Sequence, residues 1–202
     1  MLVIGVVCWI TEESQIPELR RCLDSLKEFR VILVDGKWYD MEGEQHTSIP
    51  KAYDMFAQYP NVEVIVSINK HEWENRNLYL ERCKEDDFLI WIDTDEWLEV
   101  NISPLKHIDD LFDYKNTGEQ MVSVLFQGKA HGAGIYETKR GVLYPSKTRH
   151  RDRHNELWCD GKEITQGRLN NIFGLIIHHD KSFRSEGREN AMRIRNRLKP
   201  FR

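Results

Sequence analysis

The sequence of 202 residues lacks the cysteine pattern of a disulfide framework or a zinc site. Its four cysteines are widely spaced with no CxxC pair, and three lie in apolar segments where a reduced thiol packs as a small hydrophobe. No apolar run approaches the roughly 20 residues that span a bilayer, and no internal repeat is visible. These absences favour a soluble protein without disulfides, structural zinc or a transmembrane segment.

The sequence also lacks a recognisable leader. Its first residues, MLVIGVV, contain neither the basic segment nor the small-residue cleavage site of a signal peptide. We therefore expect them to form a first strand, and we expect a cytoplasmic protein. A length of 202 residues with 40% hydrophobic content allows one well-buried domain.

Charge is unevenly distributed along the chain. Residues 1–100 carry 10 basic and 21 acidic side chains, and residues 101–202 carry 19 and 12, which gives net charges of about −11 and +7. The basic half suggests an anionic partner, either nucleic acid or the phosphates of a small ligand. The acidic half argues against a protein that coats nucleic acid over its whole surface.

Strands and helices alternate through the first hundred residues. Continuous β-branched or apolar runs predict strands buried on both faces, and apolar residues at helical spacing predict helices between them. The expected strands are 2–10, 31–35, 62–68 and 88–92, and the expected helices are 17–26, 48–59 and 74–83. This βαβαβαβ order indicates an α/β fold with a doubly wound, mostly parallel central sheet, whose ligands lie beyond the carboxyl ends of the strands.

The pattern after about residue 100 is less regular. Residues 121–127, 141–144 and 173–178 read as strands, and residues 185–198 read as a charged helix. We expect a mixed C-terminal portion built onto the same sheet, within a single domain that spans residues 1–202.

Two aspartates, Asp93 and Asp95, follow the apolar run FLIWI. Side chains at i and i+2 of an extended chain point to the same side, so the two carboxylates can share one cation. Such hard oxygen ligands suit Mg²⁺ or Mn²⁺, which take further ligands from water and substrate phosphates. The alternative is an acidic turn, since one D-x-D arises by chance in so acidic a chain. The position at a strand end is what favours a metal site.

Four stretches, in order, resemble the GT-A-fold glycosyltransferases, most closely those of family 2. They are the strand exit ITEES with the helix IPELRRCLDSL, the strand end VILVDGKWYD, the helix ENRNLYLERC, and FLIWIDTDEWL itself. Their order and spacing are more specific than any one of them. The resemblance implies a GT-A-type nucleotide-binding fold, with residues 1–100 as the nucleotide-binding half and residues 101–202 as the acceptor-side half with a C-terminal helix.

The same resemblance implies an enzyme of the hexosyltransferase type. It would move a sugar from a nucleotide-diphosphate sugar to an acceptor hydroxyl, with inversion and with Mn²⁺ or Mg²⁺ as cofactor. The acceptor would be a glycan, a protein or a lipid head group. Asp95 would ligate the metal, and Asp93 would contact the ribose or a metal-bound water. Asp35 would hold the base or ribose, while Arg76 and Thr11 would lie near the donor nucleotide.

A basic stretch of the second half, GVLYPSKTRHRDRHNELWCDG, contains two carboxylates that could act as the general base. Base assistance to an acceptor hydroxyl typically contributes about 10²–10⁴ in rate. Glu156 leads into apolar residues and would be the stronger base, whereas arginines flank Asp152 and would make it the weaker one. We prefer Glu156 and keep Asp152 as the alternative. Alternatively, the stretch is a solvated strand held by salt bridges, in which neither carboxylate acts as a base.

The run IIHHDKSF ends an expected strand with two adjacent histidines. Glycosyltransferases of the resembled type often recruit a late histidine to the metal, and only one of two neighbours on a strand faces the ligand edge. We expect His178 to be that residue. Residues 181–202 hold eight basic and two acidic side chains. Among them, Arg184 and Arg188 could offset the charge of a leaving diphosphate, or could belong to a solvated face.

Other classes of protein fit the sequence less well. A haloacid-dehalogenase-type phosphohydrolase also ends an apolar strand in D-x-D, but normally on its first strand, whereas here three strand–helix units precede the motif. A nucleotidyltransferase needs a glycine-rich loop after the first strand, and residues 11–15 contain no glycine. A nucleic-acid-binding module using the basic C-terminal helix would leave the carboxylates unexplained. We therefore expect no nucleic-acid partner, and the sequence gives no oligomeric state.

Overall fold

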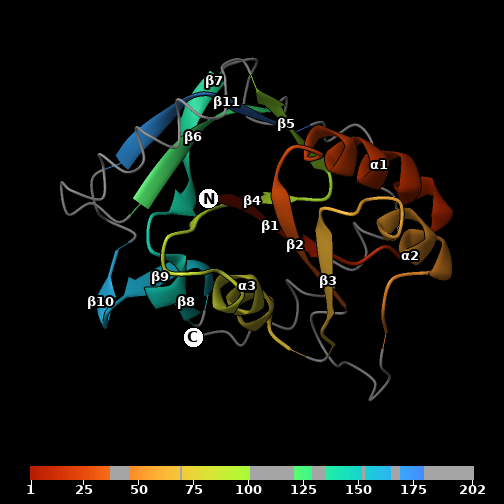
Figure 1. Cartoon of the computed structure of the whole chain (residues 1–202), viewed down its shortest axis with the longest axis horizontal. Coiled ribbons are helices and arrows are strands. Elements are labelled where there is room, and N and C mark those ends of the chain that lie inside the picture. The colour runs from red at the N-terminus through yellow and green to blue at the C-terminus, as the bar shows by residue number, and fades with distance from the viewer. Residues whose placement is uncertain are drawn as a thin grey trace, which may run out of the picture.

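The computed structural model describes residues 1–36, 46–68, 70–100, 121–128, 135–151, 153–164 and 169–179. A single eight-stranded sheet, ordered β3-β2-β1-β4-β7-β6-β11-β5, runs through the molecule (Figure 1). The strands of its first half are β1 (Leu2–Cys8), β2 (Arg30–Asp35), β3 (Val62–Val66) and β4 (Phe88–Asp93). All four are parallel, so their carboxyl ends share one edge of the sheet.

Helices connect these parallel strands, as the apolar spacing predicts. They are α1 (Ile16–Ser25), preceded by the short η1 (Glu13–Gln15), then α2 (Pro50–Phe56) and α3 (Glu72–Glu81). Proline stands in the first turn of both α1 and α2, where its missing N–H costs nothing. The three helices and four strands lie where the sequence predicts them, within a few residues at their ends.

The second half of the sheet is mixed. β7 (Ile135–Val142) pairs antiparallel with both β4 and β6 (Met121–Gly128), and β11 (Leu169–His179) pairs parallel with β6. The predicted α/β class, a mostly parallel sheet with a mixed C-terminal portion, is confirmed. Only the first half of the strand expected at 141–144 is a strand, as the end of the longer β7, and the helix expected at 185–198 lies outside the described residues.

One strand was not predicted. β5 (Glu96–Val100) begins only two residues after β4 ends, yet it pairs with β11 at the far edge of the sheet rather than with β4. Its five residues, EWLEV, do not alternate between acidic and apolar, and they directly follow the D-x-D turn. The strand exists because β11 supplies its hydrogen-bonding partner, which a local sequence pattern does not show.

Two apolar cores lie on the two faces of the central sheet. One packs α1 and α2 against β1, β2 and β4 and also takes in Leu98 of β5 and Ile177 of β11. The other packs Tyr79 and Leu80 of α3 against the opposite face, together with Leu157 of a second sheet. That small sheet is ordered β10-β9-β8, and its strands are β8 (Thr148–Arg151), β9 (Arg153–Cys159) and β10 (Lys162–Glu163).

Asn77 of α3 bonds the small sheet through two hydrogen bonds. Asn77 accepts a hydrogen bond from the backbone N–H of His150 at 2.7 Å and donates one to its carbonyl at 3.0 Å. The 3-10 turn η2 (Pro145–Lys147) leads from β7 into β8 beside it. In Figure 1 the small sheet and α3 accordingly lie side by side.

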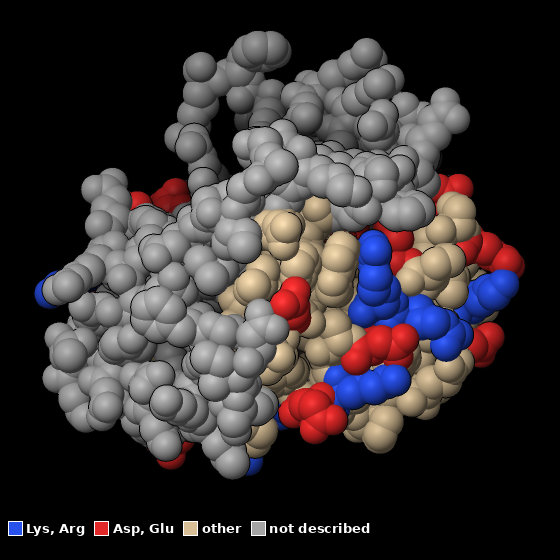
Figure 2. All heavy atoms as spheres, turned by 90° about the horizontal axis from the view of Figure 1, so that it is seen from above, with Lys and Arg blue, Asp and Glu red and all other residues tan. Residues whose placement is uncertain are grey.

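None of the helices that the structure describes is long and apolar enough to cross a membrane. On the face shown in Figure 2, the basic side chains that are described lie interspersed with acidic ones. Ion pairs such as Lys27–Asp24 and Lys51–Glu13 join charges of opposite sign. The described part of this face therefore offers no surface of a single charge sign.

Close packing at Gly5 yields a test of the fold. A Cβ built on this residue of β1 would lie 2.8 Å from Cγ of the buried Tyr79 ring. We expect Gly5→Ala to lower the free energy of unfolding by about 1–3 kcal/mol, because overpacking a filled core forces the backbone or the ring to shift. Urea denaturation measures the difference, and an unchanged midpoint would show that α3 is not seated tightly on β1.

Candidate functional site

Asp93 and Asp95 lie at the carboxyl edge of the sheet, where β4 passes into β5. Asp93 ends β4, and Thr94 and Asp95 form a two-residue turn before Glu96 begins β5. The Asp93 side chain is 37% exposed, whereas that of Asp95 is only 5% exposed. Three carboxylates therefore fall within four residues, at the edge where open α/β sheets bind their ligands.

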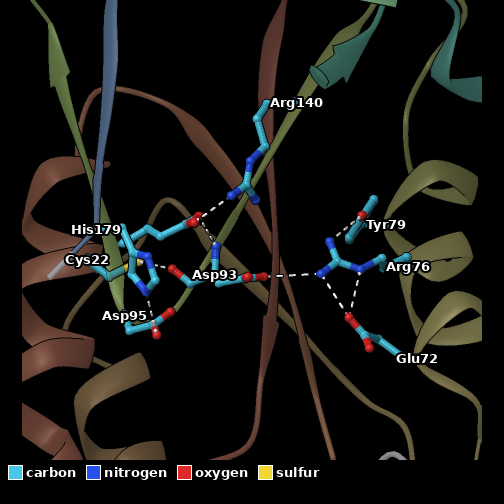
Figure 3. A network of polar contacts seen from close by, with 9 residues as sticks. Cys22, Glu72, Arg76, Tyr79, Asp93, Asp95, Arg140 and His179 are labelled. Atoms are coloured by element: carbon cyan, nitrogen blue, oxygen red, sulfur yellow. Dashed lines mark hydrogen bonds and ion pairs between the residues drawn. The ribbon is translucent and has the colours of Figure 1, made fainter. Parts of the chain in front are cut away.

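Each of these three carboxylates contacts a basic side chain from a different element (Figure 3). Arg76 Nη2 of α3 lies 3.1 Å from Asp93 Oδ1, and His179 Nε2 of β11 lies 3.1 Å from Asp95 Oδ2. Arg140 Nη2 of β7 lies 2.6 Å from Glu96 Oε1. The three contacts are independent, so α3, β7 and β11 converge on one short turn.

Arg76 is buried under the site and makes several hydrogen bonds. Its guanidinium also donates to Glu72 Oε1 at 3.0 Å and lies 3.5 Å from the Tyr79 hydroxyl. Burial acts to lower the pKa of Arg76, but Tyr79, Asp93 and Glu72 together raise it. The guanidinium is therefore held in place beside Asp93, and its place near a donor nucleotide stays a prediction.

Glu96 and Arg140 were not predicted from the sequence. Glu96 is 2% exposed, and its second oxygen, Oε2, accepts the backbone N–H of Asp93 at 2.8 Å. Burial raises the pKa of Glu96 to about 7, although Arg140 opposes the shift. An acidic residue directly after D-x-D is the sequence feature that could have indicated Glu96. No local feature of the sequence indicates Arg140, because it lies 44 residues further along the chain.

Cys22 of α1 contacts the backbone of the turn that carries Asp93 and Asp95. Its Sγ lies 3.8 Å from the carbonyl oxygen of Asp93, and Ser25 of the same helix accepts the N–H of Leu98 at 3.0 Å. Burial first, and then nearby Cys8 and Glu96, raise the pKa of the Cys22 thiol, so it stays protonated and can donate. α1 thus contacts the backbone on both sides of the turn, at Asp93 in β4 and at Leu98 in β5.

The histidine beside Asp95 is His179, whereas we expected His178. His178 is paired with Trp97 across the β11–β5 ladder, stacks on that indole at 5.1 Å, and bonds Glu99 through Nε2. Neighbouring side chains on a strand point to opposite faces, so these contacts turn His179 toward Asp95. The pairing of β11 with β5, which the sequence did not reveal, decides between the two histidines.

Asp35 lies at the end of β2 as expected, but its carboxylate faces inward. It is fully buried and accepts hydrogen bonds from the backbone N–H of Ser48 at 3.1 Å, from the Ser48 hydroxyl, and from the Tyr53 hydroxyl at 2.6 Å. A base or ribose could reach it only by replacing these bonds. In this structure Asp35 fixes the start of α2.

An open groove of about 340 Å³ lies near Asp35, beyond the carboxyl end of β1. Thr11 lines it, as does Trp9, and the described residues that line it are Trp9, Ile10, Thr11, His46, Thr47 and Ile49. A larger groove of about 440 Å³ lies at the opposite, amino edge of β2 and β3, beside Arg30 and Val62. Only the smaller groove shares an edge with Asp93 and Asp95.

One of the two predicted general bases, Glu156, lies within the described residues. Glu156 lies on β9, where it accepts a hydrogen bond from the Trp158 indole at 3.0 Å. The adjacent Leu157 packs into the core on the α3 face, whereas β5 contributes to the core on the α1 face. Asp152, Arg184 and Arg188 lie outside the described residues. Glu156 and Asp152 stay predictions from the sequence.

Asp95 and His179 are the described residues that could hold a metal ion. Among those residues, no group of three or more His, Cys, Asp or Glu side chains is arranged to do so. Mg²⁺ and Mn²⁺ sites need fewer protein ligands, because substrate phosphates and waters complete the coordination. Carboxylate oxygen suits Mg²⁺ or Mn²⁺, and imidazole nitrogen suits transition metals. The mixed pair therefore fits Mn²⁺ best.

Neither a protein-family model nor a curated protein matches the chain. Solved structures match it at low similarity. S. aureus TarS is 17% identical with a TM-score of 0.44, over 67% of this chain and 38% of that one. A Bacillus anthracis protein described as a glucose-1-phosphate thymidylyltransferase is 10% identical with a TM-score of 0.41, over 63% and 55%. The chain thus spans 38% and 55% of these two proteins' lengths.

A third structure is the 2-C-methyl-D-erythritol 4-phosphate cytidylyltransferase of Francisella tularensis. It is 11% identical with a TM-score of 0.35, over 73% of this chain and 74% of that one. Likenesses this weak carry no argument about function. The function proposed below therefore rests on the described site and on the sequence motifs.

The Asp35–Tyr53 contact predicts a pH-dependent stability. Burial, followed by the hydrogen bond to Asp35, raises the pKa of Tyr53 to about 12, compared with about 10 in an unfolded chain. We expect Tyr53→Phe to cost about 1–3 kcal/mol at neutral pH, because it leaves a buried carboxylate short of a donor. The contribution is fully present below about pH 10 and is lost as the pH rises through about 12.

Urea denaturation of wild type and Tyr53→Phe between neutral pH and pH 12 measures this contribution. Tyr59→Phe is the matched control, because the Tyr59 hydroxyl also donates to a carboxylate, at 2.9 Å, and also has a pKa raised to about 12, by burial and then by Asp24. Asp24 is 45% exposed, so water can replace that bond. Equal losses in the two variants would contradict the structural role of Asp35.

Proposed function

We propose that this protein is a metal-dependent glycosyltransferase that moves a sugar from a nucleotide-diphosphate sugar to an acceptor hydroxyl, with inversion. The observation that carries the proposal is the contact between Asp95 and His179 beside Asp93, at the carboxyl edge of the parallel strands. This is the edge where α/β folds bind nucleotides, and the donor atoms suit a cation that binds diphosphate.

Asp95 and His179 would hold the divalent ion. When bound, that ion supplies electrostatic stabilisation of the charge that develops on the leaving diphosphate. Asp93 is the more exposed carboxylate of the pair, and Arg76 holds one of its oxygens. The exposed Asp93 carboxylate would accept a hydrogen bond from a ribose hydroxyl, which would fix the donor in one orientation.

The groove beyond β1 is the site we assign to the donor nucleoside. It lies at the same edge as Asp93, and it offers an indole, Trp9, on which a base can stack. Thr11 borders the groove, and its backbone N–H is bonded to Gln15 Oε1 at 2.8 Å, which keeps the loop in place. Asp35 supports the groove from inside through Ser48.

The site favours sugar transfer over phosphate hydrolysis. A haloacid-dehalogenase-type enzyme would use Asp93, the first aspartate of the motif, as its nucleophile. Here Arg76 forms an ion pair with that carboxylate, which stabilises its charge and weakens it as a nucleophile. Three parallel strands and three helices also precede β4 in the chain. The nucleic-acid alternative rests on residues 181–202, outside the described residues.

The metal assignment is tested by three variants. We expect Asp95→Asn and His179→Ala to lose Mn²⁺ affinity by more than the roughly 10–100-fold typical of losing an outer partner of a ligand. His178→Ala is the matched control, because it removes the adjacent imidazole, which contacts Glu99 instead. Isothermal titration with Mn²⁺, alone and with nucleotide-diphosphate sugars, measures these affinities.

Two results would speak against the proposal. Nucleotide-sugar binding by Asp95→Asn at the wild-type affinity would rule out Asp95 as the diphosphate anchor. Salt-sensitive binding of nucleic acid by the wild-type protein, without any nucleotide-sugar binding, would favour the nucleic-acid-binding module.

Substitution of Trp9 tests whether the groove beyond β1 binds the donor nucleoside. We expect Trp9→Ala to weaken the binding of the preferred nucleoside diphosphate by about 1–3 kcal/mol, the usual value of base–aromatic stacking, and to leave the Mn²⁺ affinity of the free protein unchanged. Trp158→Ala, on the small sheet, is the control for removing an indole. A panel of nucleoside diphosphates with Mn²⁺ would identify the base, and an undiminished affinity in Trp9→Ala would place the nucleoside elsewhere.

A further inference from the structure

Glu96 is a buried carboxylate whose two oxygens bond to different parts of the chain. Oε2 accepts the backbone N–H of Asp93 at 2.8 Å, and Oε1 accepts Arg140 Nη2 at 2.6 Å. Burying a carboxylate is unfavourable unless it is paired and hydrogen-bonded. Both conditions are met here, at a side chain that is 2% exposed.

The bond from Glu96 to Asp93 closes the turn that carries both aspartates. It runs from a side chain back to the backbone N–H three residues earlier, the spacing by which an acidic side chain closes a helix capping box. Asp93, Thr94 and Asp95 all lie inside the loop that it closes. Arg140 of β7 holds the other oxygen, so the turn is tied to the neighbouring strand.

We propose that Glu96 is a positioning residue, which holds the Asp93–Asp95 turn in the conformation that binds the metal and is itself held by Arg140. The proposal rests on the proposed function, since it assigns to Glu96 a role toward the same cation. Glu96 is 2% exposed and each of its oxygens contacts another part of the chain, so we assign it a supporting role and not that of a ligand. It acts through the backbone of Asp93, and removal of such an outer partner typically weakens metal binding by about 10–100-fold.

The same strand carries a natural control at its other end. Asp87, just before β4, is 3% exposed, accepts the backbone N–H of Lys84 three residues earlier at 2.8 Å, and pairs with Arg30 at 3.3 Å. Like Glu96, it is buried and bonds a backbone N–H and an arginine, although both contact its Oδ2 and its Oδ1 pairs with the N-terminal amine at 3.4 Å. Asp87 lies at the amino edge of the sheet, away from Asp95. Loss of either carboxylate should destabilise the fold, and only loss of Glu96 should disturb the metal site.

The experiment compares the full chain as wild type, Glu96→Ala, Glu96→Gln and Asp87→Ala. The dissociation constant for Mn²⁺ comes from the electron paramagnetic resonance signal of the free ion, and the melting temperature is measured without metal. We expect Glu96→Ala and Asp87→Ala both to melt at lower temperature, and only Glu96→Ala to bind Mn²⁺ about 10–100-fold more weakly. Glu96→Gln should recover most of the affinity, because its amide oxygen can still accept the Asp93 N–H.

A purely structural role would make Mn²⁺ affinity follow stability, so Asp87→Ala would then lose as much affinity as Glu96→Ala, and the proposal would be wrong. Equal losses in Glu96→Gln and Glu96→Ala would also overturn it. If Glu96→Ala does not fold, Glu96→Asp takes its place in the test. Its side chain is one methylene shorter and cannot bridge both partners, so wild-type affinity in that variant contradicts the proposal.

The two proposals fail in different ways. Wild-type protein that leaves all the Mn²⁺ free contradicts the metal-dependent function, and the role of Glu96 with it. Wild-type protein that binds Mn²⁺, together with a folded Glu96→Ala of equal affinity, contradicts only the role of Glu96.

Discussion

The concentration of negative charge in the turn between β4 and β5 is the constraint on which the site depends. Three carboxylates, those of Asp93, Asp95 and Glu96, occupy three of four consecutive positions, and two of them are almost completely buried. Two unit charges 4 Å apart interact by about 4 kcal/mol at an effective dielectric constant of 20. Such a turn holds its shape only if cations or hydrogen-bond donors offset the repulsion.

The fold supplies these partners from three directions. Arg76 comes from α3 on one face of the sheet, Arg140 from β7 beside β4, and His179 from β11 at the far side. The sheet order places β7 next to β4 and brings β11 against β5. Each contact therefore depends on a strand pairing or a helix packing, and the mixed second half of the sheet completes a site that begins in the parallel half.

The unequal exposure of the two aspartates bears on their proposed roles. Asp95 is buried against an imidazole, which suits a metal ligand with a fixed direction, whereas Asp93 is the more exposed of the two, which suits a contact to a donor. The groove beside Trp9 lies at the same sheet edge. Metal, diphosphate and nucleoside would then bind along the carboxyl ends of β1 and β4, with Glu96 beneath them as a support.

The sequence by itself determined the parallel half of the fold and the place of the carboxylates, because buried strands and amphipathic helices leave local patterns that require no knowledge of their partners. The motif order also pointed to Arg76, which lies 17 residues before Asp93. The tertiary structure alone decided that β5 exists, that His179 faces Asp95 in place of His178, that Asp35 is turned inward, and that Arg140 bonds Glu96. These features depend on contacts between residues 44 to 84 positions apart or on hydrogen bonds within a buried cluster, and a local pattern of residues records neither.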